Sequence, residues 1–261
     1  IDRTNPTLFL FDSYLGSNEY LNSIKEKTKL MLIDDNNNIY DSSIPDIIYN
    51  GNIYAKKMGY FDIKGQLKFL GTKYLIMKEE YWHSSADVNS NKEGILITTG
   101  GTDEYGIASR ILEEVKDLDI KIKVIIGHGY RDECIRKIED LKASNVELIY
   151  KPNNLKELIF SSKIVITAGG STVYEVLSQK SMPIIFSLAD NQDLICKTLS
   201  KMGIEYLGKY PSIEYSRLIR VIERLYSKSI KKDDKIFNLV DGKGALLVAK
   251  ELVSQLIPNS G

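Results

Sequence analysis

The stretch of sequence that decides the fold is residues 164–192, which read IVITAGGSTVYEVLSQKSMPIIFSLADNQ. A β-branched apolar run at 164–167 leads into a pair of glycines and then into a segment with the apolar spacing of a helix. A second apolar run follows at 183–186. Strand, tight turn, helix and strand in so short a span are typical of an open parallel sheet with helical crossovers.

The same rhythm runs through the chain from residue 94 onward. Short β-branched runs alternate with segments whose apolar residues recur every three or four positions. The first pattern is typical of buried parallel strands, and the second is typical of helices that pack on a sheet. The predicted strands are residues 95–97, 124–126, 146–149, 164–166 and 183–186, and the predicted helices include 107–115, 155–159 and 194–202. The sequence therefore predicts an α/β fold with a doubly wound sheet.

The first 78 residues predict a second, smaller α/β lobe. Its candidate strands are residues 8–11, 30–33, 47–49 and 74–77, and its one clear helix is 18–27. The polar segment 79–93, which carries Trp82 and His83, is predicted to link the lobes. Residues 94–241 are predicted to form the larger α/β lobe, with the ligand-binding turns described below, and 242–261 to form a C-terminal helix that packs back toward the N-terminal lobe.

Composition excludes several classes of protein. The 261 residues carry 35 basic and 35 acidic side chains, so no net charge attracts nucleic acid or an acidic membrane. No apolar run approaches the ~18 residues of a membrane span. The two cysteines, Cys134 and Cys196, fall in predicted helices and lack metal-ligand spacing. We expect buried or half-buried free thiols, which fit a reducing cytoplasm.

The turn after residue 168 is the first candidate binding site. Gly169 and Gly170 let the backbone approach a ligand closely, and the hydroxyls of Ser171 and Thr172 join the helix-start N–H groups in a site for a diphosphate. Glu175, one turn later, is placed to accept hydrogen bonds from a ribose. The alternative is that residues 172–175 form a capping box, with Glu175 bonding back to the chain; Ser171 is another candidate cap.

A second glycine turn follows the predicted strand at 95–97. It contains Gly100, Gly101, Thr102 and Asp103 and also precedes a helix. Glycine turns at the carboxyl ends of two strands in one sheet indicate a ligand crevice. Each turn alone is also consistent with tight packing. Neither matches a Walker loop or the three-glycine dinucleotide fingerprint.

Polar residues also follow the strand at 183–186. Asn191 and Gln192 are placed to orient a substrate or a water molecule, although Asp190 or Asn191 is equally suited to cap the next helix. His128 follows a strand but is interpreted as solvated or as lying near a ligand without acting on it, and His83 is interpreted as structural or exposed. No His, Cys and Asp spacing indicates a metal site.

An ordered set of motifs resembles a known family. The set is Asp12-Ser13-Tyr14, Asp34-Asp35, Tyr49-Asn50-Gly51-Asn52, Gly71-Thr72-Lys73-Tyr74, Gly100-Gly101-Thr102-Asp103, Gly169-Gly170-Ser171-Thr172 with Glu175, Ala189-Asp190-Asn191-Gln192, and Asp241-Gly242 with Gly244-Ala245. In this order it looks like the UDP-sugar hydrolases of pseudaminic acid biosynthesis, or spore-coat polysaccharide proteins of the SpsG type. These belong to the MurG-like branch of the GT-B fold, which has two Rossmann-like lobes.

The resemblance implies hydrolysis of a UDP-linked 2,4-diacetamido-2,4,6-trideoxy sugar without a metal or cofactor. It implies that the diphosphate lies over the turns at Gly100 and Gly170, the ribose at Glu175 and the uracil near Tyr150. Tyr14 and Asn191 are the implied catalytic residues, with the sugar pointing between them. A MurG-like glycosyltransferase and a non-catalytic nucleotide-sugar binding module are the alternatives.

One departure from the family's pattern matters. Members open with a Gly-x-Gly-His turn whose His is the proposed base, and the 261 residues contain no such N-terminal segment. The N-terminal lobe is therefore expected to be incomplete, through truncation or as a shortened homologue. An incomplete lobe exposes a sheet edge, which a homodimer would cover.

Overall fold

The computed structural model describes residues 1, 3–82, 92–227 and 235–256. The chain forms two compact units. The first consists of Ile1–Lys78 together with Asp241–Gly261, and the second is Glu79–Val240. Within the segment predicted as a linker, Glu79–Tyr81 forms a short 3₁₀ helix, η3, of the second unit. Residues 83–91 of that segment, which include His83, lie outside the described residues.

The second unit is built on a six-stranded sheet in which every neighbouring pair is parallel. The spatial order is β10-β9-β8-β5-β6-β7, so the chain builds the sheet outward from β5 in one direction and then from β8 in the other. This is the doubly wound arrangement that the sequence predicts. The strands are β5 (Ile95–Thr98), β6 (Ile122–Ile126), β7 (Val146–Tyr150), β8 (Ile164–Ala168), β9 (Met182–Ser187) and β10 (Glu205–Lys209).

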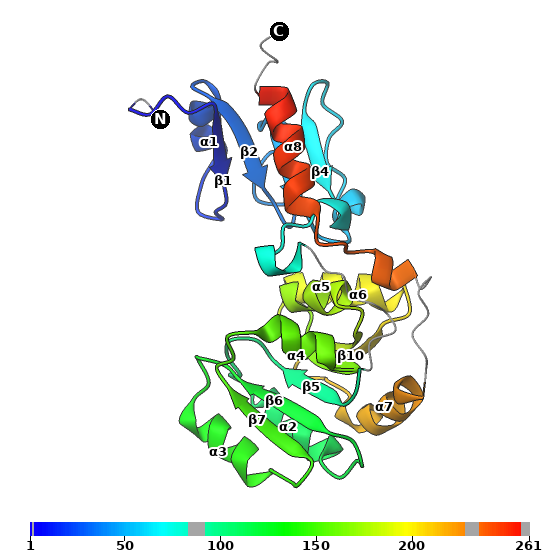
Figure 1. Ribbon diagram of the computed structural model, residues 1–261. Helices are drawn as coiled ribbons and strands as arrows, with labels where there is room; N and C mark the ends of the chain where they lie inside the picture. The colour runs from blue at the N-terminus through cyan, green and yellow to red at the C-terminus, as the bar shows by residue number, and fades with distance from the viewer. Residues whose placement is uncertain (2, 83–91, 228–234, 257–261) are drawn as a thin grey trace. The chain divides into compact units, whose positions relative to one another are not determined.

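Helices connect the strands of this sheet (Figure 1). Strands β5, β8 and β9 are buried along their whole length, which explains their continuous apolar sequences. The connecting helices are α2 (Ile107–Val115), α3 (Asp132–Asp140), α4 (Leu155–Ser161), α5 (Ser171–Ser178) and α6 (Asp190–Ser200), and α7 (Leu218–Tyr226) follows β10. Cys134 in α3 and Cys196 in α6 are free and buried, as expected.

The first unit contains a parallel four-stranded sheet in the order β1-β2-β3-β4. Alternate residues of β2 face opposite sides of this sheet. Leu30 and Leu32 pack in a cluster with residues of α1, whereas Met31 packs in a cluster with Val248 of α8. The C-terminal helix thus completes the core of the first unit. The elements are β1 (Leu8–Phe11), α1 (Asn18–Lys25), β2 (Lys29–Ile33), β3 (Ile47–Asn50), β4 (Leu67–Leu70) and α8 (Gly244–Leu256).

One predicted strand is absent from the structure, and two observed strands were not predicted. The run at 74–77 is not a strand, because Thr72–Tyr74 is a 3₁₀ helix, η2, and the Ile76 N–H donates to the Tyr49 hydroxyl at 2.9 Å. The strand beside β3 is instead β4, and its Lys68 interrupts the apolar pattern. Strand β10 was not predicted, because its sequence, EYLGK, is mostly polar.

Candidate functional site

Glycine turns follow two neighbouring strands, β5 and β8. Between these strands, the order in which the chain adds strands to the sheet changes direction. Thr98 at the end of β5 pairs with Thr167 near the end of β8. Strands β6 and β7 lie on one side of this pair, and β9 and β10 lie on the other. Such a reversal opens a crevice at the carboxyl ends of the strands, which is where open α/β sheets bind ligands.

The turn after β5 presents bare backbone. A Cβ atom added to Gly100 or Gly101 would meet no atom within 4 Å. Gly100 has φ +103°, a conformation that favours glycine. A ligand can therefore approach the peptide groups of this turn directly.

A glycine turn after β6 packs against the turn after β5. The Gly129 N–H donates to the Gly101 carbonyl at 2.9 Å, and a Cβ on Gly127 would lie 2.6 Å from the same oxygen. His128, between them, is exposed, which agrees with the interpretation of a solvated side chain. The packing of Gly127 and Gly129 against this turn was not predicted. The sequence signal for it is the Gly-x-Gly pattern that follows a neighbouring strand.

The two glycines after β8 have different surroundings. A Cβ on Gly169 would lie 2.1 Å from the Cys196 sulfur, so Gly169 is required for close packing against α6. A Cβ on Gly170 would have only the Gln192 side-chain nitrogen, at 4.0 Å, as a neighbour. Gly170 is therefore the glycine of this turn that faces open space.

Helix α5 begins directly at this turn. Its N-cap is Gly170, with no side-chain capping bond, and Ser171 and Thr172 are its first two residues. The capping-box alternative for residues 172–175 is therefore wrong, as is the alternative of Ser171 as the cap. The N–H groups of a first helical turn lack intrahelical partners, so this helix start offers donors to an anion.

Glu175 lies inside the protein, only 8% exposed, rather than on an open rim. Tyr81 of η3 is fully buried beside it. Burial and then the charge of Glu175 raise the pKa of the Tyr81 hydroxyl. Glu175 thus contributes to the surroundings of η3, a role that no local pattern indicates because the two residues are far apart in the sequence.

Asp103 holds its own turn in place. Its two carboxylate oxygens accept the N–H groups of Ile107 at 2.8 Å and Ala108 at 3.0 Å. Burial raises the pKa of this carboxyl group. The side chain therefore anchors the start of α2, whereas neighbouring Thr102 is exposed.

The start of α6 orients two predicted site residues. Ala189 is the N-cap, so the alternative in which Asp190 or Asn191 caps the helix is wrong. Asn191 is exposed, and its side-chain oxygen accepts the Gln192 N–H at 2.9 Å. The Gln192 side-chain oxygen accepts the Leu188 N–H at 2.9 Å. The Gln192 amide nitrogen is the part of the side chain that lies toward Gly170.

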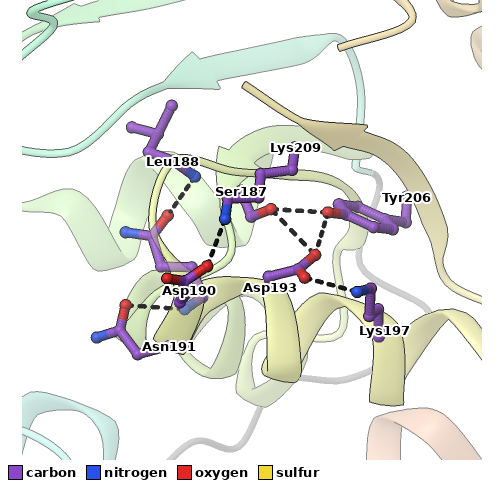
Figure 2. A network of polar contacts seen from close by, with 9 residues as sticks. Ser187, Leu188, Asp190, Asn191, Asp193, Lys197, Tyr206 and Lys209 are labelled. Atoms are coloured by element: carbon purple, nitrogen blue, oxygen red, sulfur yellow. Dashed lines mark hydrogen bonds and ion pairs between the residues drawn. The ribbon is translucent and has the colours of Figure 1, made fainter. Parts of the chain in front are cut away.

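A polar network fixes this helix to the sheet (Figure 2). The Tyr206 hydroxyl of β10 donates to Asp193 of α6 at 2.6 Å and lies 2.7 Å from the Ser187 hydroxyl of β9. Lys197 pairs with the second Asp193 oxygen at 2.7 Å. Asn191 and Gln192 are therefore presented by a helix that is anchored to two strands.

Tyr150, the expected neighbour of a uracil, ends the edge strand β7. The residue is 49% exposed, and its hydroxyl donates to Glu139 of α3 at 2.5 Å. Strand β6 separates β7 from β5. The contact with uracil remains a prediction.

In the first unit, Tyr14 belongs to a polar cluster after three neighbouring strands. Its hydroxyl donates to the Asp35 carboxylate at 3.0 Å. Asp35 follows β2, and Asn50 and Asn52 lie at and just after the end of β3. The structure thus brings together three motifs that are widely separated in the sequence.

Among the described residues, no three His, Cys, Asp or Glu side chains gather into a potential metal site. None of the helices that the structure describes combines the length and hydropathy of a membrane span.

Comparison with known proteins gives no matching family model but several relatives. An uncharacterized protein of Methanocaldococcus jannaschii is 28% identical over 95% of this chain, which spans only 58% of that relative's length. The spore coat polysaccharide biosynthesis protein SpsG of Bacillus subtilis is 26% identical, covering 92% of this chain and 74% of its own. The UDP-2,4-diacetamido-2,4,6-trideoxy-beta-L-altropyranose hydrolase of Campylobacter jejuni is 26% identical, covering 78% of this chain and 74% of its own.

Solved structures agree on the architecture. A kitacinnamycin glycosyltransferase superposes with a TM-score of 0.69 at 14% identity, over 98% of this chain and 78% of its own. MurG of Acinetobacter baumannii superposes with a TM-score of 0.61 at 14% identity, over 88% of this chain and 67% of its own. The fold is GT-B-like. The named relatives support the resemblance to the SpsG and hydrolase family.

Proposed function

We propose that the second unit binds the uridine diphosphate part of a UDP-sugar where β5 and β8 end. The observation that carries this proposal is the open backbone at Gly100, Gly101 and Gly170, at the carboxyl ends of neighbouring strands. Peptide N–H groups and the start of α5 are suited to a diphosphate, because a helix N-terminus favours negative charge. The Gln192 amide nitrogen adds a further donor beside Gly170.

We propose that the reaction is hydrolysis of a UDP-linked 2,4-diacetamido-2,4,6-trideoxy sugar. Support comes from the relative in Campylobacter jejuni, whose name states such an activity. Water would attack the anomeric carbon, and the bond from that carbon to the diphosphate oxygen would break, releasing UDP with the bonding electrons. Donors aimed at the diphosphate would stabilise the charge that develops on it. Asn191, at the start of α6 in the same unit, is expected to contact the sugar. A catalytic role for Tyr14 is proposed from the family resemblance alone.

Glycosyl transfer is the second candidate function, because MurG and the kitacinnamycin glycosyltransferase share this fold. Both reactions release UDP, and the fate of the sugar distinguishes them. Incubation with the UDP-diacetamido sugar in water, without an acceptor, should release free sugar and UDP in equal amounts. Release that requires an added acceptor would favour transfer.

The binding site is tested separately from the reaction by calorimetry with UDP and with uridine. The substitutions G101A and G170A place a methyl group over open backbone without a close contact in the protein. Each should weaken UDP binding about tenfold or more, the value of a charge-assisted hydrogen bond. Uridine lacks the diphosphate, so its affinity should not change. A wild-type protein that does not bind UDP would contradict the proposal, as would equal losses for both ligands.

A further inference from the structure

The turn between β9 and α6 presents the Gln192 side chain with a fixed polarity. Its oxygen accepts the Leu188 N–H at 2.9 Å. A backbone N–H can only donate, so the amide oxygen must face Leu188, and the amide nitrogen must point elsewhere. A Cβ built on Gly170 would have this nitrogen as its neighbour at 4.0 Å. Gln192 therefore offers N–H donors, and no acceptor, to the open side of Gly170.

One hydroxyl group ties together the residues on either side of this hydrogen bond (Figure 2). Ser187 ends β9 and directly precedes Leu188. Asp193 directly follows Gln192 in α6. The Tyr206 hydroxyl of β10 lies 2.7 Å from the Ser187 hydroxyl and donates to the Asp193 carboxylate at 2.6 Å. The bridge through Tyr206 thus closes a ring of hydrogen bonds around the start of α6.

The direction of each hydrogen bond in this ring is determined. Burial, followed by the hydrogen bond to Asp193, raises the pKa of Tyr206, so the phenol keeps its proton. Although burial raises the pKa of Asp193, the hydrogen bonds from Lys197 and Tyr206 hold it below its ordinary value. The phenol gives its one proton to the ionised carboxylate and accepts that of Ser187, which is fully buried. No group in the ring can exchange its role with another.

We propose that Tyr206 and Asp193 are positioning residues that hold the Gln192 amide nitrogen toward a diphosphate oxygen of a bound UDP-sugar. This inference rests on the proposed function and specifies it, because it assigns the polarity of one contact and the side chains that maintain it. A diphosphate oxygen that accepts hydrogen bonds meets the requirement, whereas a ligand group that only donates does not. The whole arrangement lies within the second unit.

The contact itself is tested by calorimetry with UDP and with uridine. The ratio of the UDP affinity to the uridine affinity isolates the diphosphate. Q192A should lower this ratio about tenfold or more, the value of a hydrogen bond to a charged group. Q192E keeps an acceptor for the Leu188 N–H but places a carboxylate oxygen where the amide nitrogen lies. It should lower the ratio further than Q192A, because like charges repel.

The positioning role is tested by Y206F, which removes the bridging hydroxyl without a change of charge. Y206F should lower the ratio about 3- to 10-fold, the range for a weakened hydrogen bond, although Gln192 is intact. If Tyr206 acts only through Gln192, Y206F should have no further effect on the ratio in the Q192A background.

The role of Asp193 is tested by the sign of an effect. Removal of a negative charge near a diphosphate should by itself tighten UDP binding. The positioning role predicts instead that D193A weakens it. D190A removes an exposed carboxylate from the first position of the same helix and is the charge control. It should not weaken UDP binding.

Y226F is the matched control for the loss of a tyrosine hydroxyl. The Tyr226 hydroxyl accepts the Gly94 N–H at 3.0 Å. Gly94 directly precedes β5, so this hydrogen bond lies at the opposite end of that strand from the glycine turn. Y226F should leave the ratio at the wild-type value, whatever its effect on the melting temperature.

Several results would overturn the inference in a protein that binds UDP. They are an unchanged ratio in Q192A or Y206F, a further loss from Y206F in the Q192A background, tighter UDP binding by D193A, and a loss in Y226F equal to that in Y206F. Absence of UDP binding in the wild-type protein is a different outcome, because it would overturn the proposed function together with this inference.

Discussion

At the scale of single residues, adjacent glycines in one turn have different roles. A Cβ on Gly169 would lie 2.1 Å from the Cys196 sulfur and 3.1 Å from the Gln192 carbonyl, whereas Gly170 has space. G169A should therefore lower the free energy of unfolding by about 1–3 kcal/mol, the usual cost of overpacking. G170A should leave it nearly unchanged. Urea titration of both variants measures the difference.

A double mutant at Gly169 and Cys196 tests whether the Cys196 sulfur causes the destabilisation by G169A. If the Cys196 sulfur causes it, G169A should cost less in a C196A background than in the wild-type protein. Equal destabilisation by G169A and G170A would contradict the assignment of Gly169 to packing and Gly170 to the ligand side.

At the scale of elements, the start of α2 depends on one carboxylate. Asp103 accepts the N–H groups of Ile107 and Ala108, and the residue in the N-cap position, Gly106, makes no side-chain capping bond. D103A should therefore lower the free energy of unfolding by about 1–2 kcal/mol. E104A, which removes an exposed acidic side chain from the adjacent position, is the matched control. Similar thermal stability of the two variants would show that capping does not account for the role of Asp103.

Elements were predictable from the sequence where local pattern and tertiary environment agree. Strands β5 and β8 are buried on both faces, so their β-branched runs are continuous. Strand β10 carries Glu205 and Lys209, and only its pairing with β9 makes it a strand. The run at 74–77 has the composition of a strand without a strand partner. Pairing is decided by residues distant in the sequence, which local patterns do not record.

In the candidate site, too, local features were predictable and contacts between distant segments were not. The turns at Gly100 and Gly170 were predictable because glycines directly follow apolar runs. The packing of Gly127 on the first turn and the contact between Tyr81 and Glu175 depend on chain segments that meet only in the folded protein. The identity of the N-cap of α5 was missed for a different reason, since Gly, Ser and Thr in succession all suit that position.

At the scale of the whole molecule, the first unit is assembled from both ends of the chain. The chain leaves it after Lys78 and returns at Asp241. Gly244 begins α8, and a Cβ there would lie 2.2 Å from the Leu75 carbonyl and 2.5 Å from the Leu75 nitrogen. Val248, one turn later, joins the core cluster of the sheet. Only glycine at position 244 permits so close an approach of the helix to the main chain.

G244A should therefore destabilise the first unit and spare the second. Differential scanning calorimetry should detect two transitions, and UDP should raise only that of the unit that binds it. G244A is expected to lower the other transition by an amount equivalent to about 1–3 kcal/mol, because backbone atoms cannot yield as a side chain can. K250A, at an exposed position on the same helix, should shift neither. If G244A also lowered the UDP-responsive transition, the two units would unfold as one cooperative body, and stability measured anywhere in the chain would report on the nucleotide site.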